Sequence, residues 1–159
     1  MFRDDVNTDA IISSRRKRET IDGSRLREYL FEGIDPKFAA SVLPDDVIVG
    51  GSNFGCGSAM EVAVTVLQAA GIRAVFAQTI ARSFYRNAIN NGLLAIECDT
   101  TLIVEGDRLS VELDGPEVQV LVPTRGIVLT GAPMPRLMRR ILESGGLVEF
   151  LRREGSFES

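Results

Sequence analysis

The chain has 159 residues, a formal net charge of −4, two cysteines and no histidine. Without histidine, this chain cannot build a Ser-His-Asp or Cys-His triad or a metal site with a histidine ligand. Proton transfer near neutral pH must therefore use carboxylates, hydroxyls, thiols or a partner subunit. The negative net charge argues against general nucleic-acid binding.

Length and composition are those of an ordinary globular protein. A chain of this size is expected to form a single domain over residues 1–159. No apolar stretch approaches the roughly 20 residues that span a bilayer, and the first residues lack a signal-peptide pattern, so we expect a cytoplasmic protein. The cysteines, Cys56 and Cys98, form no CxxC pair, which fits a reducing compartment.

The first part of the chain predicts short elements. The apolar residues 10–12 predict a short strand, and the basic run 13–18 predicts an exposed loop because it has no apolar residue to bury. Residues 24–30 predict one or two helical turns with Ser24 as the N-cap. Another short helix is expected to begin at Asp35-Pro36, since proline is tolerated in a first turn.

Residues 47–97 alternate between strand and helix patterns. Strands are predicted at 47–49, 74–77 and 93–97, and helices at 58–70 and 81–90. Strands that alternate with helices predict a parallel sheet with right-handed crossovers. This part of the chain is therefore expected to form a βαβαβ core.

The pattern changes after residue 99. Residues 109–113 and 118–122 alternate with period two around Asp114-Gly115, which predicts an antiparallel hairpin. The remaining predicted elements are a strand at 127–129, a helix opening at Pro133 and ending near residues 144–145, a short helix at 147–153, and a frayed tail at 154–159. The predicted fold class is α/β, with a parallel βαβαβ core, an antiparallel hairpin and a C-terminal helix.

A glycine-rich loop, residues 50–57, joins the first predicted strand to the first predicted helix. Such a loop brings backbone N–H groups and a helix N-terminus close to an anion. The loop lacks the GK[ST] of a nucleotide-triphosphate loop, the third small residue of a dinucleotide fingerprint, and the second glycine of a nucleophile elbow. Two interpretations stay open, an anion site and a tight turn without a ligand.

The two cysteines allow different interpretations. Cys56 lies close to the predicted helix N-terminus, where the pKa of a thiol falls. It is either a reactive or redox-sensing thiol or a small residue in a crowded turn. Cys98 is expected in the core.

Three segments carry a specific resemblance: residues 4–12 (DDVNTDAII), 51–58 (GSNFGCGS) and 81–94 (ARSFYRNAINNGLL). Together with residues 142–150 (LESGGLVEF), they resemble the small subunit of 3-isopropylmalate dehydratase, the stand-alone counterpart of the aconitase swivelling domain. The resemblance extends over almost the whole chain, from about residue 4 to residue 153.

The resemblance implies a β/β/α swivelling domain that docks on a large subunit. In that family the large subunit holds a [4Fe–4S] cluster, which binds a hydroxyl and a carboxylate of the substrate, so no cofactor or metal is expected in this chain. The implied reaction is the reversible dehydration and rehydration of a hydroxy-carboxylic acid in leucine biosynthesis. The implied partners are the large subunit and this small substrate, with no nucleic acid or membrane, and a homo-oligomer is possible for the isolated chain.

The family's functional residues carry over by position. Ser58 takes the place of the catalytic serine, which removes or returns a proton on the carbon next to a carboxylate. Asn53, Gly57 and the backbone around Ala59 are expected to bind a carboxylate, and Arg18 to recognise the variable group of the substrate. Since a serine hydroxyl is a poor base in water, a helix N-terminus and nearby positive charge must stabilise its alkoxide.

The chain departs from the family at the serine motif. The family usually reads Gly-Ser-Ser-Arg-Glu-His-Ala, whereas residues 57–63 read GSAMEVA. Met60 replaces a substrate-binding arginine and Val62 replaces the histidine, which explains why the chain has none. Residues 15–18 are all basic, where 3-isopropylmalate enzymes usually place apolar residues.

These departures predict an altered substrate preference, with the basic run gripping the carboxylate that Met60 no longer binds. Arg82 and Arg86 are a second source of positive charge, unless they are only surface residues. Alternatives are a homoaconitase-type or methylmalate-type dehydratase and a non-catalytic anion-binding domain. Family members also have an edge strand before the first motif, so we expect either an upstream start or a sheet that is one strand short.

Overall fold

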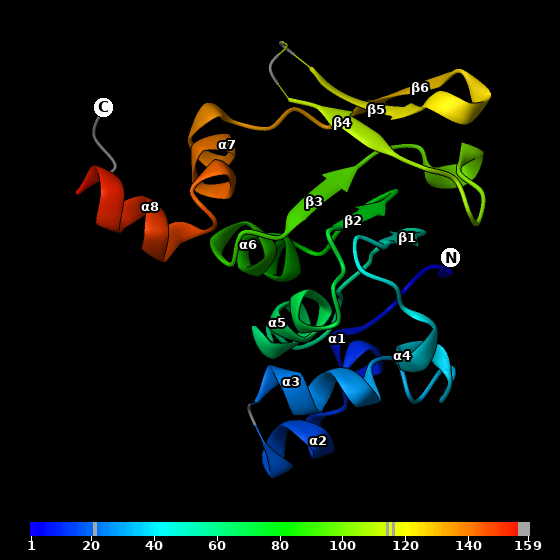
Figure 1. Ribbon diagram of the computed structural model, residues 1–159, viewed down its shortest axis with the longest axis vertical. Coiled ribbons are helices and arrows are strands. Elements are labelled where there is room, and N and C mark those ends of the chain that lie inside the picture. Colours follow the sequence, from blue (N-terminus) through cyan, green and yellow to red (C-terminus); the bar gives the residue numbers. More distant parts are fainter. Residues whose placement is uncertain (21, 114, 116, 156–159) are drawn as a thin grey trace.

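The structure, a computed structural model, describes residues 1–20, 22–113, 115 and 117–155. Its elements form three layers, with an antiparallel sheet on one side of a parallel sheet and helices on the other (Figure 1). This arrangement confirms the predicted α/β class and the β/β/α layering.

The parallel sheet is the middle layer. It contains β1 (Val47–Gly50), β2 (Ala74–Ala77) and β3 (Leu94–Glu97), in the order β1-β2-β3. The helices α5 (Val62–Ala69) and α6 (Arg82–Asn90) form the two crossovers. The predicted βαβαβ core is confirmed.

Alternating side chains of the parallel sheet contact the two outer layers. Ile48, Val75 and Ala95 belong to a core shared with α5 and α6. Their neighbours Val49 and Phe76 belong to a second core shared with the antiparallel sheet. Every residue of β2 is buried because both faces of the central strand are covered.

The antiparallel layer has three strands. They are β4 (Ser110–Glu112), β5 (Val118–Val122) and β6 (Ile127–Gly131), in the order β4-β5-β6. Val120 pairs with Val111 on one side and with Leu129 on the other. The predicted hairpin is therefore extended by β6, while Asp114 of its predicted turn lies outside the described residues.

Two C-terminal helices pack beside α6 (Figure 1). Helix α7 spans Arg136–Glu143 and α8 spans Leu147–Glu154. Helix α7 begins three residues after Pro133, so its predicted start is too early. Glu154, the first residue of the predicted frayed tail, is the last residue of α8; residues 156–159 lie outside the described part of the chain.

Short helices form the N-terminal region. They are α1 (Thr8–Ile11), α2 (Ser14–Glu19), α3 (Gly23–Leu26), the 3-10 turn η1 (Arg27–Tyr29) and α4 (Phe38–Ser41). Two further 3-10 turns are η2 (Thr100–Leu102), which precedes β4 in the chain, and η3 (Pro123–Arg125), which joins β5 to β6. Within the part of the chain that the structure describes, no helix has the length and apolarity to cross a membrane.

Several N-terminal predictions are wrong, and in three of the four cases a side-chain cap defines where the helix begins. Residues 10–12 do not form a strand, since Asn7 accepts a hydrogen bond from the Ala10 N–H at 2.7 Å and begins α1. The expected loop at 13–18 is the exposed helix α2, capped by Ser13. Asp22, rather than Ser24, caps α3. The helix expected at Asp35-Pro36 begins at Phe38.

The first eight residues lie along the outer edge of β1 and its following loop. The Phe2 N–H donates to the Val49 carbonyl at 2.7 Å, and the Thr8 N–H donates to the Cys56 carbonyl at 2.9 Å. Between them, the Gly55 N–H donates to the Val6 carbonyl at 2.7 Å. These residues therefore fix the glycine-rich loop from one side and occupy part of the β1 edge.

Candidate functional site

The glycine-rich loop leaves the carboxyl end of β1, where ligands of parallel α/β sheets commonly bind. The segment after β2 holds it from the side opposite the N-terminal residues. Thr79 accepts hydrogen bonds from the N–H groups of Asn53, through its hydroxyl at 2.7 Å, and of Phe54, through its carbonyl at 3.0 Å. Two chain segments, the N-terminal residues and the segment after β2, thus hold the loop between them.

Close packing against α6 requires a glycine in this loop. Gly55 has a φ of 75°, and a Cβ atom there would lie 2.3 Å from the Phe84 ring. The Phe84 ring also packs edge-to-face with Phe54, at 5.4 Å between centroids and 80° between planes. The tight-turn interpretation of the loop therefore has a definite packing basis at Gly55.

Ser58 is exposed on the loop, and a buried threonine holds its backbone. The Thr8 hydroxyl donates to the Ser58 carbonyl at 2.8 Å, and Thr8 is only 1% exposed. Thr8 also binds the Cys56 carbonyl through its N–H. Its two hydrogen bonds thus fix the loop on both sides of Gly57 and leave the Ser58 side chain facing outward.

Helix α5 begins later than predicted. The sequence predicts a helix from residue 58, whereas α5 begins at Val62 with Glu61 as its N-cap residue. Residues before Glu61 are held differently, because Thr8 binds the Ser58 carbonyl and the Met60 side chain is buried in the core. Since the effect of a helix dipole falls off within one turn, α5 contributes little to stabilising an alkoxide at Ser58.

The other predicted loop residues lie on both sides of Ser58. Gly57 and Ala59 are exposed, and Gly57 has a φ of 88°. Asn53 is also exposed, but its side-chain amide donates to the Asp5 carboxylate at 2.8 Å. The Asn53 amide nitrogen therefore links the loop to the N-terminal segment.

Helix α2, which carries Arg18, contacts the serine motif. The Ser14 hydroxyl lies 3.8 Å from the Met60 sulfur and 2.5 Å from Oδ1 of Asp9. Hydrogen bonds from Ser14 lower the pKa of Asp9, and the nearby Arg18 guanidinium lowers it further. Sequence reasoning assigned Ser14 no role, although it is the residue that connects α2 to the loop.

The basic run on α2 is not uniformly available to a ligand. Arg16 binds both carboxylate oxygens of Glu32, at 2.9 and 3.0 Å, and its guanidinium lies 3.7 Å from the centre of the Tyr29 ring. Its hydrogen bond lowers the pKa of Glu32. Arg15 lies 3.5 Å from Glu19. Arg18 has no acidic side chain within 4 Å among the described residues.

Met60 and Val62, the two expected departures from the family motif, both pack inward. Met60 is 5% exposed and Val62 is half-buried, and both pack in the core that α5 shares with the parallel sheet. The Met60 side chain therefore stabilises the base of the loop. Residues 50–61 contain no lysine or arginine, so the segment around Ser58 carries no positive side chain of its own.

Neither cysteine belongs to a cluster-binding group. Cys98 is buried, as predicted, and burial together with Asp99 raises the pKa of its thiol to about 11. Cys56 is a half-buried free thiol in the loop. In the residues that the structure describes, no three His, Cys, Asp or Glu side chains lie together as metal ligands. The described residues do not fit an iron–sulfur cluster.

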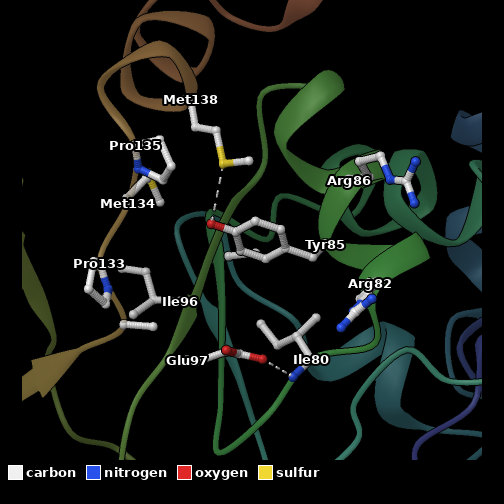
Figure 2. Close-up of a pocket in the computed structure, with 12 residues that line it drawn as sticks. Ile80, Arg82, Tyr85, Arg86, Ile96, Glu97, Pro133, Met134, Pro135 and Met138 are labelled. Atoms are coloured by element: carbon white, nitrogen blue, oxygen red, sulfur yellow. Dashed lines mark hydrogen bonds between the residues drawn. The ribbon is translucent and has the colours of Figure 1, made fainter.

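Arg82 and Arg86 lie elsewhere, beside a pocket that sequence reasoning missed. Figure 2 shows this pocket between α6, β3 and the segment that leads into α7. No residue of the glycine-rich loop or of α2 is among those that line it. This pocket therefore does not bring these two arginines together with Ser58 or Arg18.

These features define a class of protein, a three-layered β/β/α domain with an exposed serine at the carboxyl edge of its parallel sheet. The segment that carries this serine, residues 50–61, is called the serine loop below. The family model of the aconitase C-terminal domain matches residues 40–101. The structure superposes on the crystal structure of 3-isopropylmalate dehydratase from Methanocaldococcus jannaschii with a TM-score of 0.87. That comparison has 42% sequence identity and covers 97% of this chain and 90% of the other.

Curated relatives match over almost the whole chain. The isopropylmalate/citramalate isomerase small subunit of M. jannaschii is 45% identical, over 96% of this chain and 90% of the relative. The 3-isopropylmalate dehydratase small subunit of Methanosarcina acetivorans is 42% identical, over 96% and 93%. The methanogen homoaconitase small subunit of M. jannaschii is 42% identical, over 99% and 91%.

The chain belongs to the 3-isopropylmalate dehydratase small-subunit family, within the aconitase swivelling-domain fold.

Replacing Gly55 with alanine is expected to lower the free energy of unfolding by about 2–4 kcal/mol, since the methyl group collides with Phe84 and the positive φ is strained. Gly106→Ala is the matched control, because Gly106 has a φ of 88° and a Cβ atom there would meet no other atom within 4 Å. It should cost only about 1 kcal/mol. Denaturant unfolding measures both variants, and equal losses would contradict the role of the Phe84 contact.

Proposed function

We propose that this chain is the small subunit of a 3-isopropylmalate dehydratase-like hydro-lyase. It would isomerise a hydroxy-dicarboxylic acid by dehydration and rehydration, together with a large subunit that holds a [4Fe–4S] cluster. The observation that carries the proposal is the exposed Ser58, on a loop that Thr8 anchors and beside the helix that carries Arg18. The chain is also similar to such small subunits over almost its whole length.

Ser58 is the proposed catalytic residue. Its oxygen takes the proton from the carbon next to a substrate carboxylate during dehydration and returns a proton to carbon during rehydration. The cluster of the partner would bind the substrate's hydroxyl and carboxylate and assist departure of the hydroxyl as water. The remaining steps for this chain are positioning and charge stabilisation.

Substrate binding is assigned to the surroundings of Ser58. We propose that exposed backbone at Gly57 and Ala59 binds a carboxylate of the substrate and that Asn53 supports this surface through its bond to Asp5. Arg18 contacts the variable group of the substrate in this proposal. Its helix contacts the loop through Ser14, and its guanidinium has no ion-pair partner among the described residues. Arginine suits this role since it binds carboxylates bidentately.

The same proposal extends to the domain organisation, the partner subunit and the location of the chain. Residues 1–159 would act as one swivelling domain that docks on the large subunit, in the cytoplasm and in leucine biosynthesis. The small hydroxy-acid would bind between the two subunits, since this chain supplies no cluster ligands among its described residues.

A second candidate function is a homoaconitase-type dehydratase. It is favoured by Arg18 on α2, which has no ion-pair partner within the described ranges and suits a substrate with a further carboxylate in place of an aliphatic group. The similarity to a methanogen homoaconitase small subunit, at 42% identity, supports the same alternative. Turnover of isopropylmalate and homocitrate by the reconstituted enzyme discriminates between the two candidates.

Ser58→Ala should lower kcat of the reconstituted two-subunit enzyme by about 10²- to 10⁴-fold, since the variant lacks the proton-transfer group. Ser52→Ala is the matched control, because Ser52 is in the same loop and its hydroxyl contacts Gln78. The control should keep near-normal turnover. Unchanged turnover in Ser58→Ala would favour a non-catalytic anion-binding domain.

Thr8→Val keeps the shape of the buried side chain but removes its hydrogen bond to Ser58, at a cost of about 1 kcal/mol in stability. We expect kcat to fall while KM changes little, since Ser58 loses its position. Thr8→Ser restores a hydroxyl and should recover much of the turnover. Steady-state kinetics and denaturant unfolding of both variants test this; equal kcat in the two variants would rule out positioning through the hydroxyl.

Arg18→Leu should lower kcat/KM for a substrate with a further carboxylate by about 10- to 150-fold, corresponding to about 1.5–3 kcal/mol for a charged hydrogen bond. Its kcat/KM for isopropylmalate should change much less. Arg15→Leu is the control on the same helix, since Arg15 pairs with Glu19. An equal loss for both substrates in Arg18→Leu would contradict a role in specificity.

A further inference from the structure

The pocket beside α6 is separate from the serine loop. It has a volume of about 600 Å³, which is within the range of small-molecule sites. Figure 2 shows its walls: α6 on one side, the segment that leads into α7 on the other, and residues of β3 between them. The proposed function does not use this pocket.

The wall opposite α6 is apolar and conformationally restricted. Pro133 and Pro135 fix the backbone on either side of Met134, and Met138 continues the wall on α7. Ile96 of β3 forms part of the same surface. Methionine side chains adapt to the shape of an aliphatic ligand, so this wall suits a short hydrocarbon group.

The α6 side carries positive charge. Arg82 and Arg86 lie one helical turn apart, both line the pocket and both are exposed. In the described part of the chain, neither has a carboxylate within 4 Å, although the chain has more acidic than basic residues. Two such guanidinium groups beside an apolar wall are complementary to a carboxylate with a hydrocarbon tail.

Two polar side chains define the interior. The Tyr85 hydroxyl lies 3.8 Å from the Met138 sulfur, so it points to the wall opposite the arginines (Figure 2). Burial and the charge of Glu97 raise the pKa of Tyr85, which keeps its proton in place. Glu97 accepts a hydrogen bond from the Ile80 N–H at 2.6 Å. Because Glu97 is negative, a ligand carboxylate is directed to the arginine end.

We propose that this pocket is a second ligand site, which binds a small aliphatic carboxylate. The carboxylate pairs with Arg82 and Arg86, and the aliphatic group packs beside the Tyr85 ring on Met134 and Met138. The site does not depend on the identity of the substrate at Ser58.

The four methionines of the full chain are reporters for its test. In the chain labelled with ¹³C-methyl methionine, titration with 4-methylpentanoate should shift the methyl signals of Met134 and Met138, with saturation in the millimolar range. The signals of Met60, beside the serine loop, and of Met1 should stay in place. A shift at Met60 alone, or no saturable shift at the pocket, would overturn the proposal.

Charge is tested with a neutral probe and a variant. The amide 4-methylpentanamide should bind about tenfold more weakly than the acid, and Arg82→Gln/Arg86→Gln should weaken the acid by about the same factor. Arg73→Gln, at an exposed arginine paired with Asp45, is the control and should bind normally. Equal affinity for acid and amide in the unmodified chain overturns the role of the arginines even if the double variant fails to fold.

The assembled enzyme gives the last comparison. With the labelled chain bound to its large subunit, the Met134 and Met138 shifts should persist, and excess hydroxy-acid substrate should leave them unchanged. Loss of the shifts on assembly would show that the large subunit covers the pocket and would overturn a ligand site in the working enzyme. Displacement of the probe by substrate would overturn its independence from the serine site.

Discussion

The pairing of the N-terminal residues with the glycine-rich loop is the constraint on which the rest of the site depends. Residues 2–8 follow β1 and then its loop, and their hydrogen bonds determine where the loop backbone can lie. On the other side, Thr79 and the Phe84 ring restrict the same backbone. A loop held in this way exposes Ser58 at a fixed place although Ser58 belongs to no helix or strand.

The packing of residues 60 and 62 bears on the absence of histidine from the chain. Val62 and Met60, where the resemblance implies a histidine and an arginine, both pack in the core. Residues 50–61 contain no lysine or arginine, whereas the adjacent α2 carries Arg18 and contacts Met60 through Ser14. Substrate recognition is thus proposed to lie more on α2 and the partner subunit than on the loop itself.

Much of the fold could be predicted from the sequence, and the errors have a common origin. Strands β1, β2 and β3 are short apolar runs whose burial on both faces leaves a strong signal. The helices at residues 8–19 leave a weaker signal in the sequence. Because α1 has four residues and α2 buries none, neither shows an amphipathic pattern. Their caps, Asn7 and Ser13, were the available signal. The later start of α5 had no such signal, since it follows from the contact with Thr8.

The sequence by itself determined the βαβαβ order, the family resemblance and the exclusion of histidine chemistry. It did so because hydrophobic period, glycine spacing and residue identity are local properties of the chain. Only the tertiary structure decided that Thr8 holds Ser58. It also decided that Arg16 pairs with Glu32, whereas Arg18 has no ion-pair partner within the described residues. The same holds for the pocket that Arg82 and Arg86 border. Each of these depends on groups that are distant in the chain and come together only when the layers pack.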